Sequence, residues 1–306
     1  MKKDYDVIVI GGGPAGYAAA LYTVRSGFST LVMERMAAGG QMNETTQIDN
    51  YPGFDEGIDG FSLGMKMQNG ALRFGAETKY AEVKSVELRD QVKRIETDDG
   101  IYTAKAVVIA TGAGHKHLGA EKETELVGRG VGYCASCDGM FYRGKTVAVV
   151  GGGNSAAADA LVLSRIAKKV YLIHRRNSLR ATRVYHEPLE KAENVEFVWN
   201  SEVSQLLHGD KLTGVVVKDV RSGVERELEL DGLFISIGRD PATGLFRGQL
   251  ELDERGYIVA GESTETNIPG VYAVGDVRTK AVRQIITAAS DGAVAAHFVE
   301  EYLKDR

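Results

Sequence analysis

Short apolar runs, each followed by a glycine-rich turn and a helical pattern, dominate the hydrophobic pattern of this chain. Residues 7–10 read Val-Ile-Val-Ile, residues 11–16 contain four glycines, and residues 17–26 are rich in Ala and Leu. Continuous β-branched runs of this length are typical of strands buried on both faces of a parallel sheet. With a second apolar run at 30–33, the pattern predicts a βαβ unit.

The same pattern recurs near the middle of the chain. It predicts a strand at 146–150, a turn at 151–156, a helix at 157–167 and a further strand at 170–173. Two such units predict an α/β fold with two Rossmann-like dinucleotide-binding domains.

Two further apolar runs, at 107–110 and 233–237, lead into Gly-containing turns. We interpret them as the last strands of the two modules, each followed by a crossing between domains. Near the C-terminus an apolar run at 271–274 precedes a helical pattern from about 283 to 303. This helix needs a sheet to pack on, and the first domain offers the most economical one.

We therefore expect the second domain to be an insertion. The predicted boundaries are 1–113 and 246–306 for a discontinuous first domain, and 114–245 for the inserted one.

The composition is that of an ordinary globular protein, with 43% hydrophobic and 26% charged residues. A net charge of -5 argues against a nucleic-acid partner. No apolar run approaches the roughly 18 to 20 residues that span a bilayer, and the N-terminus lacks the apolar segment of a signal peptide. We therefore expect a protein of the reducing cytoplasm with no membrane partner.

The first glycine-rich turn fits the dinucleotide-binding pattern G-x-G-x-x-G as Gly11, Gly13 and Gly16. The first glycine allows a tight turn, the second lets the backbone approach a pyrophosphate, and the third lets the helix pack on the strand. Glu34 ends the following strand, where a carboxylate can accept hydrogen bonds from ribose hydroxyls. The motif predicts nucleotide binding; the alternative is a structural turn.

The second turn fits G-x-G-x-x-A as Gly151, Gly153 and Ala156, but no acid ends the next strand. A basic segment follows instead, consisting of His174, Arg175, Arg176 and Arg180. Guanidinium groups bind a ribose 2′-phosphate that a carboxylate would repel, so this module is predicted to prefer NADPH over NADH. A solvated basic patch is the alternative.

The only two cysteines, Cys134 and Cys137, form a C-x-x-C pair between the two glycine-rich turns. Such a pair can close a reducible disulfide, and two flanking nucleotide sites suggest an electron relay through it. A zinc site with His115 and His117 is the alternative, but the spacing matches no common zinc finger. Asp138 beside the pair is either the acid–base group of the exchange or a turn residue.

With these motifs in place, the chain resembles the bacterial-type, low-molecular-weight thioredoxin reductases, flavoenzymes of the pyridine nucleotide-disulfide oxidoreductase family, over nearly its full length. The most specific match is Cys134 to Gly139, just before the second glycine-rich turn. Other matches are Gly39-Gly40-Gln41, Asn50 to Gly53, Ala110 to Ala113, Gly275-Asp276-Val277 and Arg283-Gln284.

The resemblance implies FAD in the first domain, NADPH in the second, thioredoxin as the disulfide substrate, and a homodimer. It implies that Cys137 faces the flavin, that Cys134 attacks the partner disulfide, and that Asp138 is the acid–base group. The FAD residues it implies, together with those of the first motif, are Gly11, Gly13, Pro14, Ala15, Gly16, Glu34, Gly40, Gln41, Asn50, Thr111, Gly112, Gly275, Asp276, Arg283 and Gln284. The NADPH residues are Gly153, Asn154, Ser155, Ala156, His174, Arg175, Arg176 and Arg180.

In this family the NADPH domain rotates during turnover, and the Gly-bearing crossings near 113–114 and 238–239 fit such hinges. The chain departs from the family pattern at 177–179, where an acid-led triplet is common. We expect neither the C-terminal redox tail of the high-molecular-weight enzymes nor the N-terminal extension of alkyl hydroperoxide reductase flavoproteins. A relative served by ferredoxin, a dithiol oxidase and a flavin-binding sensor without turnover remain as alternatives.

Overall fold

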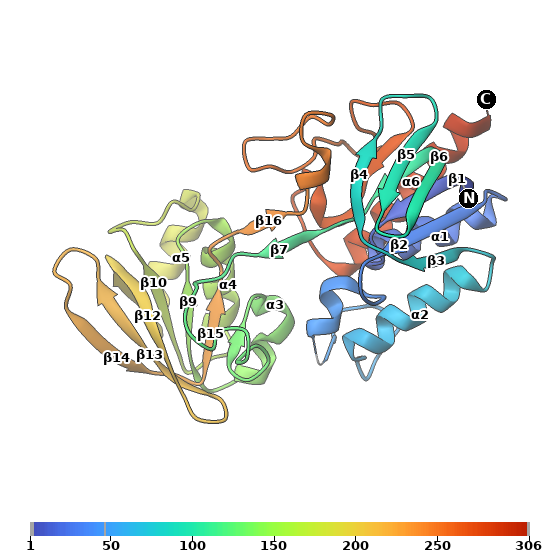
Figure 1. The fold of residues 1–306 in the computed structure, drawn as a ribbon. Coiled ribbons are helices and arrows are strands. Elements are labelled where there is room, and N and C mark those ends of the chain that lie inside the picture. Colours follow the sequence, from blue (N-terminus) through green and yellow to red (C-terminus); the bar gives the residue numbers. More distant parts are fainter. Residues whose placement is uncertain (1–2, 46, 305–306) are drawn as a thin grey trace. The chain divides into compact units, whose positions relative to one another are not determined.

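The computed structural model describes residues 3–45 and 47–304, which form two compact units (Figure 1). One unit is discontinuous, comprising Met1–Gly114 and Asp240–Arg306, and the other is His115–Arg239. The chain thus crosses between the units at 114/115 and 239/240. These positions lie next to the Gly-bearing crossings predicted near 113–114 and 238–239, whereas the predicted domain boundaries were 113/114 and 245/246.

The second crossing lies earlier than the predicted domain boundary at 245/246 because hydrogen bonds hold the following residues to the first unit. Ala242 N–H donates to the Gly112 carbonyl oxygen at 3.0 Å. In return, the Thr111 hydroxyl donates to the Ala242 carbonyl oxygen at 2.8 Å. At the crossing itself, β7 (Ala113–His115) pairs with β16 (Arg239–Pro241) (Figure 1).

The first unit is built on a seven-stranded sheet of order β3-β2-β1-β6-β5-β4, with β17 also paired to β6. The neighbours β3, β2, β1, β6 and β17 are parallel, and β5 and β4 extend the sheet in antiparallel fashion. The strands are β1 (Lys3–Ile10), β2 (Thr30–Glu34), β3 (Glu77–Tyr80), β4 (Val83–Glu87), β5 (Lys93–Thr97), β6 (Gly100–Ile109) and β17 (Val271–Ala273).

Strand β1 is buried on both of its faces, which explains its continuous apolar sequence. Val7 and Val9 belong to one hydrophobic core, while Ile8 and Ile10 belong to another. Because successive side chains of a strand point to opposite faces, the two cores lie on opposite sides of the sheet. Helices of the unit are α1 (Pro14–Arg25), α2 (Gly60–Leu72) and α6 (Ile285–Lys304), with short 3-10 helices η1 (Gly40–Glu44), η4 (Gly244–Phe246) and η5 (Gly275–Val277).

The C-terminal helix α6 packs closely against α1. A Cβ on Gly292 would lie 2.3 Å from the carbonyl oxygen of Ala15, so only glycine allows this approach. The C-terminal helix thereby packs against the helix that follows the first glycine-rich turn. Among the described residues, no helix combines the length and the apolar character that crossing a membrane requires.

The second unit contains a five-stranded parallel sheet of order β11-β10-β9-β15-β8 and a three-stranded antiparallel sheet, β12-β13-β14. Its strands are β8 (Val131–Gly132), β9 (Thr146–Val150), β10 (Lys169–His174), β11 (Val195–Trp199), β12 (Ser201–His208), β13 (Leu212–Asp219), β14 (Glu225–Glu229) and β15 (Gly232–Ile235). Its helices are α3 (Ala135–Asp138), η2 (Gly139–Tyr142), α4 (Asn154–Ser164), η3 (Arg183–Tyr185) and α5 (His186–Glu190).

Both motif helices begin three positions earlier than the apolar pattern predicted, at Pro14 and Asn154 rather than at 17 and 157. The reason is that the last residues of each glycine-rich turn already have helical geometry. Proline suits the first helical position, where no N–H is needed for the helix. Each helix N-terminus therefore lies directly in the turn that is predicted to bind a phosphate.

Candidate redox and nucleotide-binding sites

One edge of the first sheet gathers four loops. Ile10 lies beside both Met33 and Ile109 in the sheet register, and Ile109 also pairs with Ala273. The carboxyl ends of β1, β2, β6 and β17 therefore meet at the same edge, which is where α/β sheets bind ligands. Glu34 is the last residue of β2, and the first glycine-rich turn, the 110–112 turn and the 275–276 turn come after the ends of β1, β6 and β17.

The glycines of the first turn have different physical roles. A Cβ on Gly11, whose φ is +110°, would lie 2.4 Å from the Ala110 carbonyl oxygen, and a Cβ on Gly16 would lie 1.9 Å from that of Gly11. A Cβ on Gly13 would meet nothing within 4 Å. Since no side chain caps α1, the space beside Gly13 and the free helix N–H groups fit a pyrophosphate.

Glu34, the predicted ribose ligand, lies against this turn. Its Oε2 accepts a hydrogen bond from Gly12 N–H at 2.8 Å, and its Oε1 accepts one from Met36 N–H at 3.0 Å. Each carboxylate oxygen has further acceptor capacity. The side chain is thus oriented by the backbone and can still accept from ribose hydroxyls.

Gly40 and Gln41 begin η1, which runs beside the first turn. A Cβ on Gly40 would lie 3.5 Å from Gly13 Cα. The Gln41 amide nitrogen donates to the carbonyl oxygen of Ala113, next to Gly112. The structure therefore brings the predicted residues of η1 and of the 111–112 turn together, although they are far apart in sequence.

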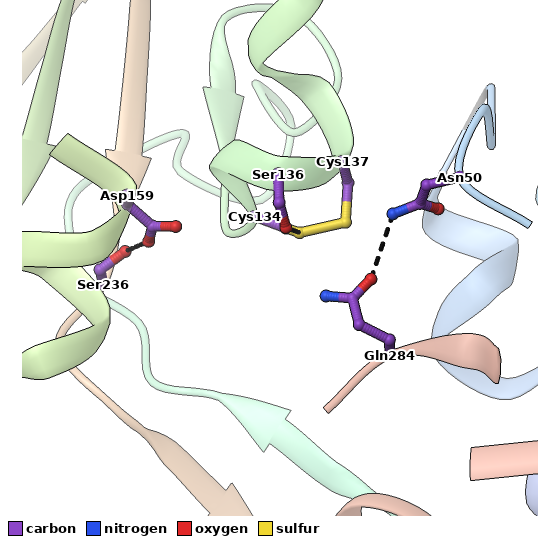
Figure 2. The surroundings of a disulfide bond; sticks show 7 residues. All are labelled: Asn50, Cys134, Ser136, Cys137, Asp159, Ser236 and Gln284. Carbon is purple, nitrogen blue, oxygen red and sulfur yellow. Dashed lines mark hydrogen bonds between the residues drawn. A yellow bond between two sulfur atoms is a disulfide. The ribbon is translucent and has the colours of Figure 1, made fainter. Parts of the chain in front are cut away.

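The segment before α6 supplies the remaining predicted FAD residues. A Cβ on Gly275 would lie 3.0 Å from the Cβ of Ala15, which places the Gly275–Asp276 turn against the start of α1. Asn50 Nδ2 donates to Gln284 Oε1 at 3.1 Å (Figure 2).

Arg283, next to Gln284, is held by the backbone. Its two terminal nitrogens donate to the carbonyl oxygens of Lys280 and Arg278 at 3.2 Å, and its guanidinium lies 4.2 Å from the ring centroid of Tyr257. Its buried Nε has no hydrogen-bond partner among the described residues. A buried donor without a partner costs free energy, so this position fits a polar cofactor.

The second glycine-rich turn repeats the first. A Cβ on Gly151 would lie 2.3 Å from the Ser236 carbonyl oxygen, and a Cβ on Gly152 would lie 2.2 Å from the His174 ring. A Cβ on Gly153 would meet nothing within 4 Å, and no side chain caps α4. The second unit thus offers the same kind of phosphate cradle.

The basic segment lies beside this second cradle. Arg180 N–H donates to the Gly152 carbonyl oxygen at 2.6 Å, and Asn154 Oδ1 accepts from Thr182 N–H at 2.8 Å. Asn154 and Ser155, the first residues of α4, are exposed.

The guanidinium groups of Arg175, Arg176 and Arg180 are exposed and make no hydrogen bond or ion pair within the part of the chain that the structure describes. His174 is buried, and burial together with these arginine charges lowers its pKa. Its Nε2 has no partner among the described residues. Free guanidinium groups and an unsatisfied imidazole nitrogen beside a phosphate cradle fit a 2′-phosphorylated nucleotide.

Cys134 and Cys137 form a disulfide at the start of α3 in the second unit (Figure 2). The N–H groups of Cys137 and Asp138 donate to the Cys134 carbonyl oxygen at 3.2 and 3.0 Å, which closes the short helical turn. The Ser136 hydroxyl lies 3.3 Å from Cys134 Sγ. Ala135 is buried in the same core as α4, so the turn is anchored on that helix.

Asp138 follows the disulfide directly and is largely buried. Burial raises the pKa of its carboxyl group from 3.8 to about 6. A carboxyl group that titrates near neutral pH can both donate and accept protons there. This property suits an exchange in which a disulfide becomes two thiols.

The sequence alone did not identify Asp159, a residue with a perturbed pKa in the second unit. Asp159, in the middle of α4, accepts a hydrogen bond from the Ser236 hydroxyl (Figure 2). Burial raises the pKa of Asp159, and this hydrogen bond and the Ala135 N–H partly oppose the rise. A single acid inside a helical pattern looks like a surface residue, so no motif could have identified it.

The histidines upstream of the cysteines have other partners. The His115 ring stacks on Tyr133 with centroids 4.5 Å apart, and His117 Nδ1 lies 3.0 Å from Glu123 Oε1. Among the described residues, no group of three or more His, Cys, Asp or Glu side chains could hold a metal ion.

Residues 5–292 match the family model described as pyridine nucleotide-disulphide oxidoreductase. A protein named thioredoxin reductase from Streptomyces clavuligerus is 47% identical, covering 99% of this chain and 95% of the relative. A thioredoxin reductase structure from Streptococcus pyogenes is 42% identical with a TM-score of 0.91, covering 99% of both chains. A structure of a ferredoxin-flavin thioredoxin reductase from Clostridium acetobutylicum is 30% identical with a TM-score of 0.55, covering 100% of both.

The chain belongs to the pyridine nucleotide-disulphide oxidoreductase family. Within that family, its resemblance to the thioredoxin reductases extends over the full length, and the predicted α/β fold with two Rossmann-like domains is confirmed.

Proposed function

We propose that this protein is an NADPH-dependent thioredoxin-disulfide reductase that uses FAD. The observation that carries the proposal is the closed Cys134–Cys137 disulfide, set on α3 beside a buried Asp138 with a raised pKa. The full-length likeness to proteins named thioredoxin reductase supports the identity of the partner. We further propose a homodimer in the cytoplasm, where NADPH is available and thiols are kept reduced.

We assign FAD to the first unit. The Gly11–Gly16 turn would hold the pyrophosphate and Glu34 the adenosine ribose, since these groups have the open space and acceptor capacity described above. The 275–284 segment, with Asn50 and Gln41, would bind the flavin half.

We assign NADPH to the second unit. The 153–156 turn at the start of α4 would hold its pyrophosphate. The exposed guanidinium groups of Arg175, Arg176 and Arg180 would hold its 2′-phosphate, with His174 beneath them. The absence of an acid at the end of β10 favours NADPH over NADH.

Bound FAD would transfer to the disulfide the two electrons that it receives from NADPH. Two electrons and two protons convert the Cys134–Cys137 disulfide into two thiols, and Asp138 donates or accepts the proton at the sulfur atoms. The Cys134 thiolate then attacks the thioredoxin disulfide and forms a mixed disulfide. Attack by Cys137 on Cys134 Sγ reforms the internal disulfide and releases reduced thioredoxin.

Anaerobic addition of NADPH is expected to bleach the flavin absorbance rapidly, and NADH should do so much more slowly. Replacing Arg175 and Arg176 with Ala removes two groups expected to bind the 2′-phosphate. The NADPH KM should rise roughly 10- to 100-fold, because hydrogen bonds to charged groups contribute about 1.5–3 kcal/mol. Stopped-flow absorbance and initial rates with both nucleotides measure this.

A matched variant, Arg221→Ala, removes an exposed arginine on the β13–β14 turn and should leave both nucleotides unaffected. If the double variant retains the wild-type preference for NADPH, the assignment of the second site is wrong. If NADPH does not bleach the wild-type flavin at all, the donor is another carrier. Ferredoxin is then the first candidate, given the Clostridium acetobutylicum structure. A flavin that no donor reduces would favour a sensor without turnover.

Asp138→Asn should lower turnover by about 100-fold, because an amide cannot donate or accept the proton. The same variant should be more stable than the wild type at pH 8. Because the folded protein favours the neutral carboxyl group, the stability that this preference contributes is fully present below pH 3.8, the usual pKa. It is lost as the pH rises through the folded-state pKa of about 6, where the buried group becomes charged. Removing the buried charge should therefore increase the free energy of unfolding at pH 8 by about 1–3 kcal/mol.

Thermal melting at pH 8 and pH 4, with steady-state rates, tests this trade of stability for activity. The stability gain should shrink at pH 4, where the wild-type carboxyl group is mostly protonated in the folded state. An equal gain at both pH values, or an unchanged rate, would contradict the role given to Asp138.

A further inference from the structure

In the first unit, Asp291 of α6 forms a buried charged cluster with Arg278 and Lys280 of the 275–284 segment. Asp291 of α6 accepts with Oδ2 from Gly275 N–H at 2.8 Å, from Arg278 Nε at 2.9 Å and from Lys280 Nζ at 2.8 Å. Its Oδ1 accepts from Arg278 Nη2 at 2.8 Å. Burial tends to raise the pKa of Asp291, but the hydrogen bonds from Arg278 and Lys280 outweigh it and lower the pKa.

Through these contacts the carboxylate of Asp291 holds the segment at Gly275, Arg278 and Lys280, and Arg278 Nη1 also donates to the carbonyl oxygens of Ala260, Gly261 and Thr279. Gly275, with φ of +73°, begins a turn that lies against Ala15 at the start of α1. The carbonyl oxygens of Arg278 and Lys280 in turn accept the hydrogen bonds of Arg283. Asp291 therefore helps to position the backbone of residues 275–280 and, through the carbonyl oxygens of Arg278 and Lys280, the side chain of Arg283.

Burying these charged groups costs free energy, so stability alone does not explain the cluster. Moving three charged groups out of water carries a desolvation penalty, and apolar replacements of buried ion pairs are often as stable. Two cations also face a single carboxylate. What the cluster supplies is precise geometry, since multiple short hydrogen bonds to one carboxylate allow a single backbone conformation.

We propose that Asp291 is a positioning residue for the flavin half of FAD. It holds the Gly275–Gln284 segment in its binding conformation, whereas the Gly11–Gly16 turn and Glu34, to which Asp291 makes no hydrogen bond within the described residues, would bind the ADP half. This inference rests on the proposed assignment of FAD to the first unit.

The test compares two ligands on the full-length chain from which flavin has been removed. FAD is titrated by the quenching of its fluorescence, and ADP by calorimetry. Asp291→Asn keeps the size of the side chain but turns an amide toward two cations. We expect the Kd for FAD to rise by at least about tenfold, because a charged hydrogen-bond network is broken, while the Kd for ADP stays within about twofold.

Two further variants make the result unambiguous. Glu301→Gln removes an exposed carboxylate from the same helix and should change neither Kd. Lys280→Met removes one cation but leaves the paired hydrogen bonds of Arg278, so a smaller rise in the Kd for FAD is expected, with ADP binding unchanged. If Asp291→Asn does not fold, Lys280→Met decides the question.

An unchanged FAD affinity, or an equal loss for FAD and ADP, would overturn the inference, since the latter would mean a general loss of stability. A wild-type chain that binds ADP but not FAD would instead refute the proposed function.

Discussion

Replacing either Cys134 or Cys137 with serine is expected to abolish thioredoxin-dependent turnover, by roughly three orders of magnitude or more, because the nucleophile or its resolving partner is lost. Serine has nearly the size of cysteine but cannot form a sulfur–sulfur bond. The α3 turn is closed by backbone hydrogen bonds to the Cys134 carbonyl oxygen, so both variants should fold. NADPH-dependent turnover with thioredoxin, measured by Ellman's reagent, gives the rate.

The two variants should differ in what they trap. Cys137→Ser keeps the proposed attacking sulfur, so it should form a stable mixed disulfide with a single-cysteine thioredoxin whose thiol is activated by thionitrobenzoate. Cys134→Ser should form none. If Cys134→Ser formed the complex instead, the interchange role would move to Cys137. Ser136→Ala is the matched control: it removes only the hydroxyl group 3.3 Å from Cys134 Sγ and should retain most of the turnover.

Gly16→Ala is expected to abolish stable FAD binding and to lower the melting temperature of the flavin-free protein. The new Cβ would lie 1.9 Å from the Gly11 carbonyl oxygen, a backbone atom that cannot move aside without displacing the turn. Forcing such a backbone shift typically costs several kcal/mol, which corresponds to more than about 100-fold in FAD affinity. Thermal melting with and without FAD, and FAD titration, measure the two effects.

Gly13→Ala is the informative comparison, because a Cβ there would meet no protein atom within 4 Å. The flavin-free protein should melt as the wild type does. FAD binding should nevertheless weaken, since the methyl group would occupy space that the pyrophosphate needs. Wild-type FAD affinity in Gly13→Ala would show that the phosphate does not approach this residue, and a harmless Gly16→Ala would contradict the packing argument.

Much of the architecture could be read from local patterns. The run Val7–Ile10 had to be buried on both faces because it contains no polar residue, and the two cores on either side of β1 show that it is. Glu34 was predicted as a ribose ligand from its place at a strand end, and its carboxylate accepts a hydrogen bond from Gly12 of the glycine-rich turn. These features were predictable because neighbours in sequence are neighbours in the βαβ unit.

Features that depend on distant segments were not predictable from the residues alone. The Asn50–Gln284 hydrogen bond and the Asp159–Ser236 pair each join residues far apart in the chain. Asp291 illustrates the reason: on its helix it resembles any surface acid, and only the tertiary structure shows that it is buried and bonded to Gly275, Arg278 and Lys280.

The sequence by itself determined the chemistry of this protein: two glycine-rich turns, an acid after one and arginines after the other, and a single C-x-x-C pair. Those patterns are local, and the steric and charge requirements of a nucleotide or a disulfide act over a few residues. Only the tertiary structure decided which residues beside the two cysteines are buried, why the pKa of Asp138 is raised to about 6, and which hydrogen bonds hold the segment before α6. Burial and long-range hydrogen bonds set these properties, and both exist only once distant segments pack together.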